Sequence, residues 1–261
     1  MEDSSPVELL WTGGWDSTFR LLTLLLDHRV AVQPTYIADP TRSSSPIEQR
    51  TMTRIRTALF DHHPHTRDLL RPTNVVSMSD IAPDPEIQGA FDRIVSHNRI
   101  GDQYGWLARY CRQRDVRGAE LSINNTAHGA HLVTGKWAQR VRDPHGHMTW
   151  CVPEDCPDDD VRVVFSRFSM PMWDQPKSHS AEVARLNGWT ELMGMTWFCH
   201  RPSRNAQPCG LCNPCQYAIE EGFGWRIPRQ RRALSKVYRH TLMPLRNRAR
   251  QFLRRMRVAP T

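Results

Sequence analysis

The residues best suited to chemistry near the N-terminus form a glycine turn. The turn runs through Leu10, Trp11, Thr12, Gly13, Gly14, Trp15, Asp16, Ser17 and Thr18. Two adjacent glycines let the backbone approach an anion closely, and a following helix offers unpaired amides and a partial positive charge to phosphate oxygens. A carboxylate such as that of Asp16 lies beside a polyphosphate only with a cation, typically Mg²⁺, between them. The turn therefore predicts a phosphate site, with a plain tight turn as the alternative.

A second candidate site is a cluster of cysteines near the C-terminus. Cys209, Cys212 and Cys215 follow the spacing C-x2-C-x2-C, and Cys199 precedes them by ten residues. Four thiolates with no position for water are typical of a structural Zn²⁺ site. An iron–sulfur cluster, a redox pair and unligated thiols are the alternatives at this point.

Alternating strands and helices must position these two sites. Strands are predicted from the apolar patterns at residues 7–11, 30–38, 74–78, 119–123 and 161–168. Helices are predicted at residues 17–28, 46–60, 87–97, 103–114 and 178–187. This alternation predicts an α/β fold with a doubly wound parallel sheet of about five strands. Residues 142–160 are rich in Pro, His, Asp and Gly, and we expect them to form a long surface excursion.

Charge is distributed unevenly along the chain, whose net charge is +8. Residues 226–261 contain twelve Lys or Arg and no Asp or Glu. Residues 1–225 therefore contain 23 of the 35 basic residues and all 27 acidic residues. Apolar residues recur there at steps of three or four, at Leu234, Tyr238, Leu242, Leu245, Ala249, Phe252 and Met256. The tail therefore predicts a basic amphipathic helix, kinked near Pro244. It would contact RNA, an anionic surface or a protein partner, or pack on the rest of the chain as a solvated helix.

Composition excludes several classes of protein. Hydrophobic residues make up 39% and charged residues 24% of the chain, which excludes wholesale disorder and a fibrous repeat. No apolar run reaches the roughly 18 residues of a transmembrane helix. The first residues, Met1, Glu2 and Asp3, lack the basic and apolar pattern of a signal peptide. We therefore expect a cytoplasmic protein with reduced cysteines, and homo-oligomers remain open.

The two candidate sites together resemble those of a known enzyme family. The glycine turn resembles the SGGxDS signature of the PP-loop ATP pyrophosphatase superfamily, with Thr12 in place of the first serine. The later segment follows the order of the 7-cyano-7-deazaguanine synthases, which are nitrile-forming ligases of queuosine biosynthesis. Its matching positions are Pro171, Lys177, the predicted helix at 180–187, Cys199 and the run Cys209-Gly210-Leu211-Cys212-Asn213-Pro214-Cys215. The resemblance spans residues 7–220.

This resemblance implies a fold and an activity. It implies a PP-loop, adenine nucleotide alpha-hydrolase-like ATP-binding domain at residues 1–198, a zinc lobe at 199–225 and the basic helical tail at 226–261. The family adenylates a carboxylate with ATP, releases pyrophosphate and then AMP, and transfers ammonia to the carboxylate. Its substrate is 7-carboxy-7-deazaguanine, and two ATP molecules are consumed per nitrile.

The resemblance also implies roles for single residues. Residues 10–18 would bind ATP, with Asp16 directed toward Mg²⁺. Lys177, one of three lysines in the chain, would stabilise the reacting phosphates, with a solvated lysine at a helix start as the alternative. The four cysteines would hold a structural Zn²⁺.

One loop departs from the family pattern. The second strand of the family leads into Tyr-Gly-Gln-Arg-His, whereas residues 36–45 here read Tyr-Ile-Ala-Asp-Pro-Thr-Arg-Ser-Ser-Ser. In the family this loop neighbours the nucleotide and the substrate, so the resemblance supports the chemistry better than the identity of the substrate. The candidates for substrate contact here are Arg42, Ser43, Ser44, Glu48 and Arg50.

Two other functions remain alternatives. One is a PP-loop enzyme that modifies tRNA or another macromolecule held by the basic tail. Thiolation by this superfamily often needs an extra cysteine pair, for which Cys111, Cys151 and Cys156 are the remaining candidates. The other is a zinc-stabilised nucleotide-binding module without turnover.

Overall fold

The computed structural model describes residues 5–126, 129–239 and 241, and the chain divides into two units. Unit 1 comprises Met1–Asp39 and Gln49–Thr196, and unit 2 comprises Pro40–Glu48 and Trp197–Thr261. The boundary predicted after residue 198 lies close to Trp197, where the longer part of unit 2 begins. Unit 2 joins the cysteine segment to the start of the tail, and it also includes residues 40–48, which are remote in sequence.

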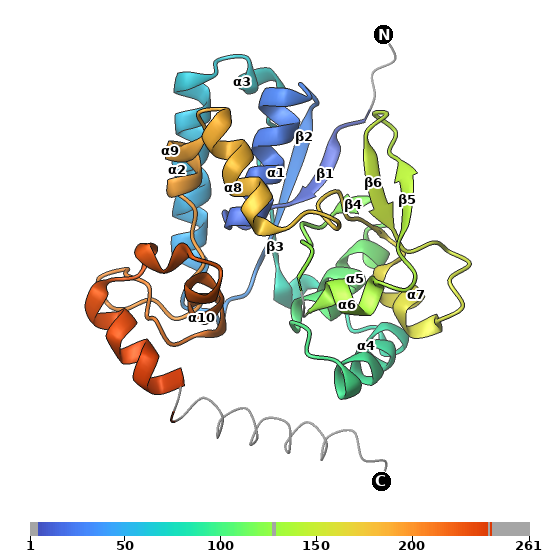
Figure 1. The fold of residues 1–261 in the computed structure, drawn as a ribbon. Helices are drawn as coiled ribbons and strands as arrows, with labels where there is room; N and C mark the ends of the chain where they lie inside the picture. Colours follow the sequence, from blue (N-terminus) through green and yellow to red (C-terminus); the bar gives the residue numbers. More distant parts are fainter. Residues whose placement is uncertain (1–4, 127–128, 240, 242–261) are drawn as a thin grey trace. The chain divides into compact units, whose positions relative to one another are not determined.

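A five-stranded parallel sheet forms the centre of unit 1 (Figure 1). Its strands are β1 (Val7–Leu10), β2 (Val32–Ala38), β3 (Asn74–Ser77), β4 (Ala119–Glu120) and β7 (Phe168–Ser169). They lie in the order β3-β2-β1-β4-β7, and every neighbouring pair is parallel. The predicted α/β class is thus confirmed. The order reverses between β1 and β4, and ligands of such sheets bind outside the carboxyl ends of the strands at this switch point.

Helices cover both faces of the sheet because successive side chains of a strand point to opposite faces. Val7 and Leu9 of β1 belong to one buried cluster, and Leu10 belongs to another. The first cluster includes residues of α1 (Trp15–Leu22), α2 (Ser45–His62), α8 (Lys177–Leu186) and α9 (Thr190–Gly194). The second includes residues of α4 (Pro85–His97), α5 (Gln103–Gln113), α6 (Ala130–Thr134) and α7 (Asp159–Phe165).

The strand predicted at residues 161–168 is wrong over most of its length. Asp159–Phe165 is helix α7, and the fifth strand is the short β7 that follows it. Val161, Val164 and Phe165 are buried at the spacing i, i+3, i+4 of a helix face. Asp158 caps this helix by accepting a hydrogen bond from the amide of Val161 at 3.1 Å. A short apolar run fits either element, and here the cap and the acidic first turn favour the helix.

The long surface excursion predicted at residues 142–160 contains regular structure. An antiparallel hairpin lies there, formed by β5 (Gln139–Arg142) and β6 (Met148–Cys151). Its turn is closed by the carboxylate of Asp143, which accepts hydrogen bonds from the amides of His145 and His147 at 2.9 and 2.8 Å. Gly146 has a φ of +83°, which glycine adopts without strain.

The remaining elements are short. They are η1 (Thr23–Asp27), α3 (Thr66–Leu69), η2 (Met78–Asp80), α10 (Asn213–Glu220) and η3 (Phe223–Arg226). The predicted tail helix is present at residues 229–239 and 241, and its continuation with the kink near Pro244 lies outside the described residues. Among the described residues, no helix has the length and apolar character needed to cross a membrane.

Candidate functional site

The glycine turn joins the carboxyl end of β1 to the start of α1. Gly13 has a φ of +68°, a left-handed conformation that strains any residue with a Cβ atom. Gly14 precedes the helix as its extended N-cap residue, and no side chain caps the helix there. The amides of the first helical turn have no carbonyl partners within the helix, and the helix dipole makes this end partly positive. The turn thus has the backbone geometry to bind an anion.

Hydroxyl groups hold the turn in this shape. Thr12 accepts a hydrogen bond from the amide of Gly14 at 3.3 Å, and its own amide donates to the hydroxyl of Ser17 at 3.5 Å. The indole of Trp11 donates to the hydroxyl of Thr18 at 3.1 Å, and both side chains are completely buried. Trp11 and Thr18 therefore present no exposed side chain to a ligand.

Asp16 lies in the first turn of α1 with a cation and an amide beside it. The Nζ of Lys177 lies 3.5 Å from Oδ2 of Asp16, and the amide group of Asn124 donates to Oδ1 at 3.0 Å. The side chains of Asp16 and Lys177 are 27% and 25% exposed, so solvent reaches both. The structure thus brings together the two residues that were predicted to be catalytic.

Loops at the carboxyl edge of the sheet position this cluster. The amide of Asn125, after β4, donates to the carbonyl of Gln175, after β7, at 3.0 Å. Ser180 of α8 accepts a hydrogen bond from the indole of Trp15 at 3.1 Å and donates to the carbonyl of Lys177 at 2.8 Å. The start of α8 is therefore tied to the start of α1.

Asn124 was not predicted as a site residue. It is 5% exposed and follows the short strand β4, whose carboxyl end lies at the switch point of the sheet. The sequence signal for it was the pair Asn124 and Asn125 directly after the predicted strand at 119–123. Residues that follow parallel strands meet at one edge of the sheet, where ligands bind.

Four of the five residues predicted to contact the substrate, Arg42, Ser43, Ser44 and Glu48, lie in the short segment of unit 2, whereas Arg50 lies in unit 1. Ser44 donates a hydrogen bond to the carboxylate of Glu48 at 2.7 Å, and both side chains are buried. Ser43 donates to the carbonyl of His200 at 3.4 Å. Burial, followed by the positive charge of Arg42, lowers the pKa of the His200 imidazole. The four residues of the short segment belong to the same unit as the cysteines, and their contact with a substrate stays a prediction.

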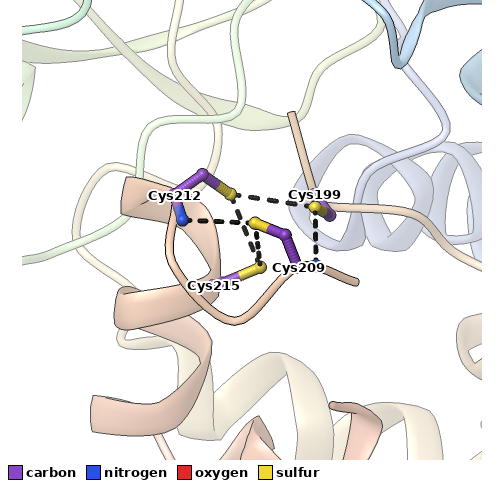
Figure 2. Close-up of side chains that lie close together, drawn as sticks. All are labelled: Cys199, Cys209, Cys212 and Cys215. Carbon is purple, nitrogen blue, oxygen red and sulfur yellow. Dashed lines mark hydrogen bonds between the residues drawn. The ribbon is translucent and has the colours of Figure 1, made fainter. Parts of the chain in front are cut away.

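Four cysteine sulfurs converge in unit 2 (Figure 2). The Sγ atoms of Cys199, Cys209, Cys212 and Cys215 all lie within 4.8 Å of one another. The Cys199–Cys212 distance is 3.8 Å, the Cys209–Cys215 distance is 3.9 Å and the Cys212–Cys215 distance is 3.4 Å. A zinc tetrahedron with bonds of about 2.3 Å has sulfur–sulfur edges of about 3.8 Å. The cluster can therefore hold a metal ion such as zinc.

Hydrogen bonds to sulfur favour the thiolate form that a metal requires. The amide of Cys209 donates to Sγ of Cys199 at 3.2 Å, and the amide of Cys212 donates to Sγ of Cys209 at 3.3 Å (Figure 2). The amide of Leu211 also donates to Sγ of Cys209 at 3.3 Å. Hydrogen bonding among the four sulfurs lowers the pKa of the Cys209 thiol and raises those of Cys199 and Cys215, whereas the backbone hydrogen bonds act to lower the pKa of the Cys199 and Cys209 thiols.

The sequence around the cysteines explains their arrangement. Gly210 has a φ of +77°, and a Cβ atom there would lie 2.7 Å from the carbonyl oxygen of Arg231. The buried amide group of Gln216 donates to the carbonyl of Gly210 at 2.6 Å and to the hydroxyl of Ser235 at 2.7 Å. Because Ser235 lies in the helix at 229–239, these bonds attach that helix to the cysteine turn.

Comparison with known proteins adds no assignment to this geometry. No protein-family model matches the chain, and no curated protein matches it.

Proposed function

We propose that the chain is an ATP-dependent ligase that forms AMP and pyrophosphate while it joins ammonia to a carboxylate. The observation that carries this proposal is the meeting of the glycine turn, Asp16 and Lys177 at the switch point of the sheet. The resemblance of the turn to the PP-loop signature supports it. Adenylation of a carboxylate and transfer of ammonia need alignment of the reactants and stabilisation of developing charge. This polar cluster therefore suffices without a protein nucleophile.

In this proposal the residues of the cluster divide the work. The backbone amides of the turn and of the first turn of α1 bind phosphate oxygens. Asp16 would hold Mg²⁺, which neutralises phosphate charge when bound. Lys177 is held by its ion pair with Asp16 and stabilises negative charge that develops on the reacting phosphate.

The proposed reaction has two transfers. A carboxylate oxygen of the substrate attacks the α-phosphorus of ATP, the bond to the β-phosphate oxygen breaks, and pyrophosphate leaves. Ammonia then attacks the activated carbon, loses a proton, and AMP leaves with the electrons of the carbon–oxygen bond. The best-supported substrate is 7-carboxy-7-deazaguanine, whose amide would be adenylated by a second ATP and lose AMP and a proton to give the nitrile.

The other cysteines disfavour thiolation as the function. Burial raises the pKa of the Cys111 thiol to about 12. Burial also raises the pKa values of Cys151 and Cys156. A catalytic cysteine needs a lowered pKa because the thiolate is the nucleophile, so these observations favour the ligase.

We further propose that the four-cysteine cluster holds Zn²⁺ in a structural role. Four sulfur ligands fill a tetrahedral shell and leave no position at which zinc could activate water or substrate. The metal would then stabilise unit 2, while the chemistry depends on residues of unit 1.

Product analysis tests the proposed function. The zinc-loaded protein is mixed with Mg-ATP, ammonium and 7-carboxy-7-deazaguanine, and the products are identified by mass spectrometry. We expect AMP, pyrophosphate and the amide or nitrile. Asp16→Asn should abolish AMP formation, whereas Asp174→Asn, at an exposed position of the same unit, should leave it unchanged.

Each negative result has a defined meaning. Binding of ATP without AMP release under all conditions would favour a nucleotide-binding module. AMP formation by Asp16→Asn at the rate of the unchanged protein would disprove the role assigned to the glycine turn.

A further inference from the structure

Unit 2 has a strong excess of positive charge. It contains 15 of the 35 Lys and Arg residues of the chain but only three of the 27 Asp and Glu residues. Its net charge is therefore +12, whereas unit 1, with 20 basic and 24 acidic residues, has −4. An anionic partner is thus attracted to unit 2 and not to unit 1.

The helix at residues 229–239 presents apolar side chains away from the interior of unit 2. Ser235 is buried and marks the inward side, because it is bound to Gln216 next to the cysteine turn. With about 3.6 residues per turn, Val237 and Leu234 lie on the outer side, one turn apart. Leu234 is 46% exposed and Val237 is 61% exposed.

Exposed cations and a tryptophan belong to the same part of unit 2. Arg229 and Lys236 are exposed on the same helix as Leu234 and Val237. Trp225, in η3 just before the helix, is 65% exposed. A Cβ atom at the neighbouring Gly224 would lie 3.8 Å from a side-chain carbon of Arg232, so η3 lies close to the helix at that residue. We call this set of exposed side chains on η3 and the helix, Trp225, Arg229, Leu234, Lys236 and Val237, the basic apolar face.

We propose that the basic apolar face binds the surface of an anionic lipid membrane. Lipid headgroups attract the cations, and the acyl boundary accepts Leu, Val and Trp side chains that water surrounds in the free protein. RNA would also attract the cations and stack on the tryptophan, but it offers no apolar phase to Leu234 and Val237. The exposed aliphatic side chains therefore favour the membrane over the nucleic acid.

Vesicle binding by the full chain tests this proposal. The protein is sedimented with vesicles of phosphatidylcholine alone and with vesicles that also contain phosphatidylglycerol. We expect binding to the anionic vesicles only, with an affinity that falls as added salt screens the charges. The double variant Leu234→Ser with Val237→Ser should bind at least about tenfold more weakly, and Lys236→Gln about fivefold more weakly.

Unit 1 offers matched control positions. Leu186 of α8 is 67% exposed, and Lys136 is exposed, so Leu186→Ser and Lys136→Gln should bind like the unchanged protein. The metal content of each variant shows whether unit 2 remains folded. Equal binding to neutral and anionic vesicles, or unchanged binding by the double variant, would overturn the proposal. So would binding of single-stranded RNA without vesicle binding, because the partner would then be a nucleic acid.

Discussion

Unit 1 buries apolar side chains on both faces of its sheet, whereas the buried apolar cluster of unit 2 is small and consists largely of cysteines. Among the described residues this cluster contains five buried residues, which are Cys199, Cys212, Cys215, Ala218 and Ile227. Partly buried aromatic residues such as Trp197 and Phe198 pack against it. A core of this size stabilises little structure by itself, because small units bury only a modest share of their apolar surface.

Net charge and charge pairing also favour the stability of unit 1 over that of unit 2. Unit 1 has a net charge near neutrality and pairs Arg20 with Glu120 inside its core. Unit 2 has a net charge of +12, and the repulsion among its cations opposes a compact state. We therefore expect unit 2 to need a bound metal for its fold, and unit 1 to be stable through burial and internal pairing. The predictions below test this difference.

The largest effect is expected when the metal site is removed. Cys209→Ala with Cys212→Ala leaves two thiols, which do not hold a structural metal. Because a structural zinc supplies roughly 10 kcal/mol of folding free energy, unit 2 should lose its structure. Hydrogen exchange should show full exposure of the amides of α10, while the amides of β1 and β2 in unit 1 stay protected.

Two cysteines outside the cluster provide the control for this experiment. Cys151→Ala with Cys156→Ala changes the same number of thiols in unit 1 and should leave metal content and exchange in unit 2 unchanged. Retention of one metal per chain by the first double variant would show that the four cysteines are not the metal site.

The next largest effect is expected from the buried ion pair of unit 1. The guanidinium of Arg20 donates to both carboxylate oxygens of Glu120 at 2.7 and 2.6 Å, and their side chains are 7% and 3% exposed. Glu120→Gln leaves a buried cation without its partner and should lower the free energy of unfolding by about 3–5 kcal/mol. Denaturant unfolding measures this change. Asp160→Asn removes the partner of the exposed Arg93 and should change stability little.

Features that depend on residues close together in the sequence were predictable in both units. The glycine turn between β1 and α1 follows from Gly13 and Gly14 at the end of an apolar run. The cysteine cluster follows from the spacing of Cys209, Cys212 and Cys215. In both cases the backbone geometry is specified within about one turn of chain.

Features that depend on tertiary contacts were not predictable. Strand β7 has two residues and is defined by pairing with β4, so its propensity gives little signal, whereas β4 lies within the strand predicted at residues 119–123. The hydrogen bond from Asn124 to Asp16 arises because two distant loops meet at one sheet edge. Likewise, only the folded chain brings residues 40–48 to the unit that contains Cys199.

A smaller effect, on rate and not on fold, is expected at Lys177. Lys177→Gln removes the cation that lies 3.5 Å from Asp16 and should lower the rate of AMP formation about 100-fold to 1,000-fold. Lys177→Arg keeps the charge and should recover part of this loss. Lys136→Gln, also in unit 1, should have no effect. Loss of AMP formation together with a lower unfolding midpoint would instead assign Lys177 a structural role.

The smallest effect is expected from the acid response of unit 1 at His28. Its ring stacks on that of His147 with centroids 3.7 Å apart, and burial, followed by the charges of His147 and Arg20, lowers the pKa of His28 from 6.5 to about 4. The folded state thus keeps this imidazole neutral while the unfolded state takes up a proton below about pH 6.5. Stability is unaffected above that pH and falls between about pH 6.5 and pH 4, by about 1 kcal/mol at pH 5 once solvent screening of this half-buried ring is taken into account.

His28→Gln removes the group that titrates. The difference in unfolding free energy between about pH 7.5 and pH 5, measured with denaturant, should therefore be about 1 kcal/mol smaller in this variant. His179→Gln, at an exposed position of the same unit, should respond to acid like the unchanged protein. An equal loss in the His28 variant would mean that other groups cause the acid response of unit 1. The same measurement on the double cysteine variant isolates unit 1, because unit 2 is then unfolded at both pH values and no longer contributes.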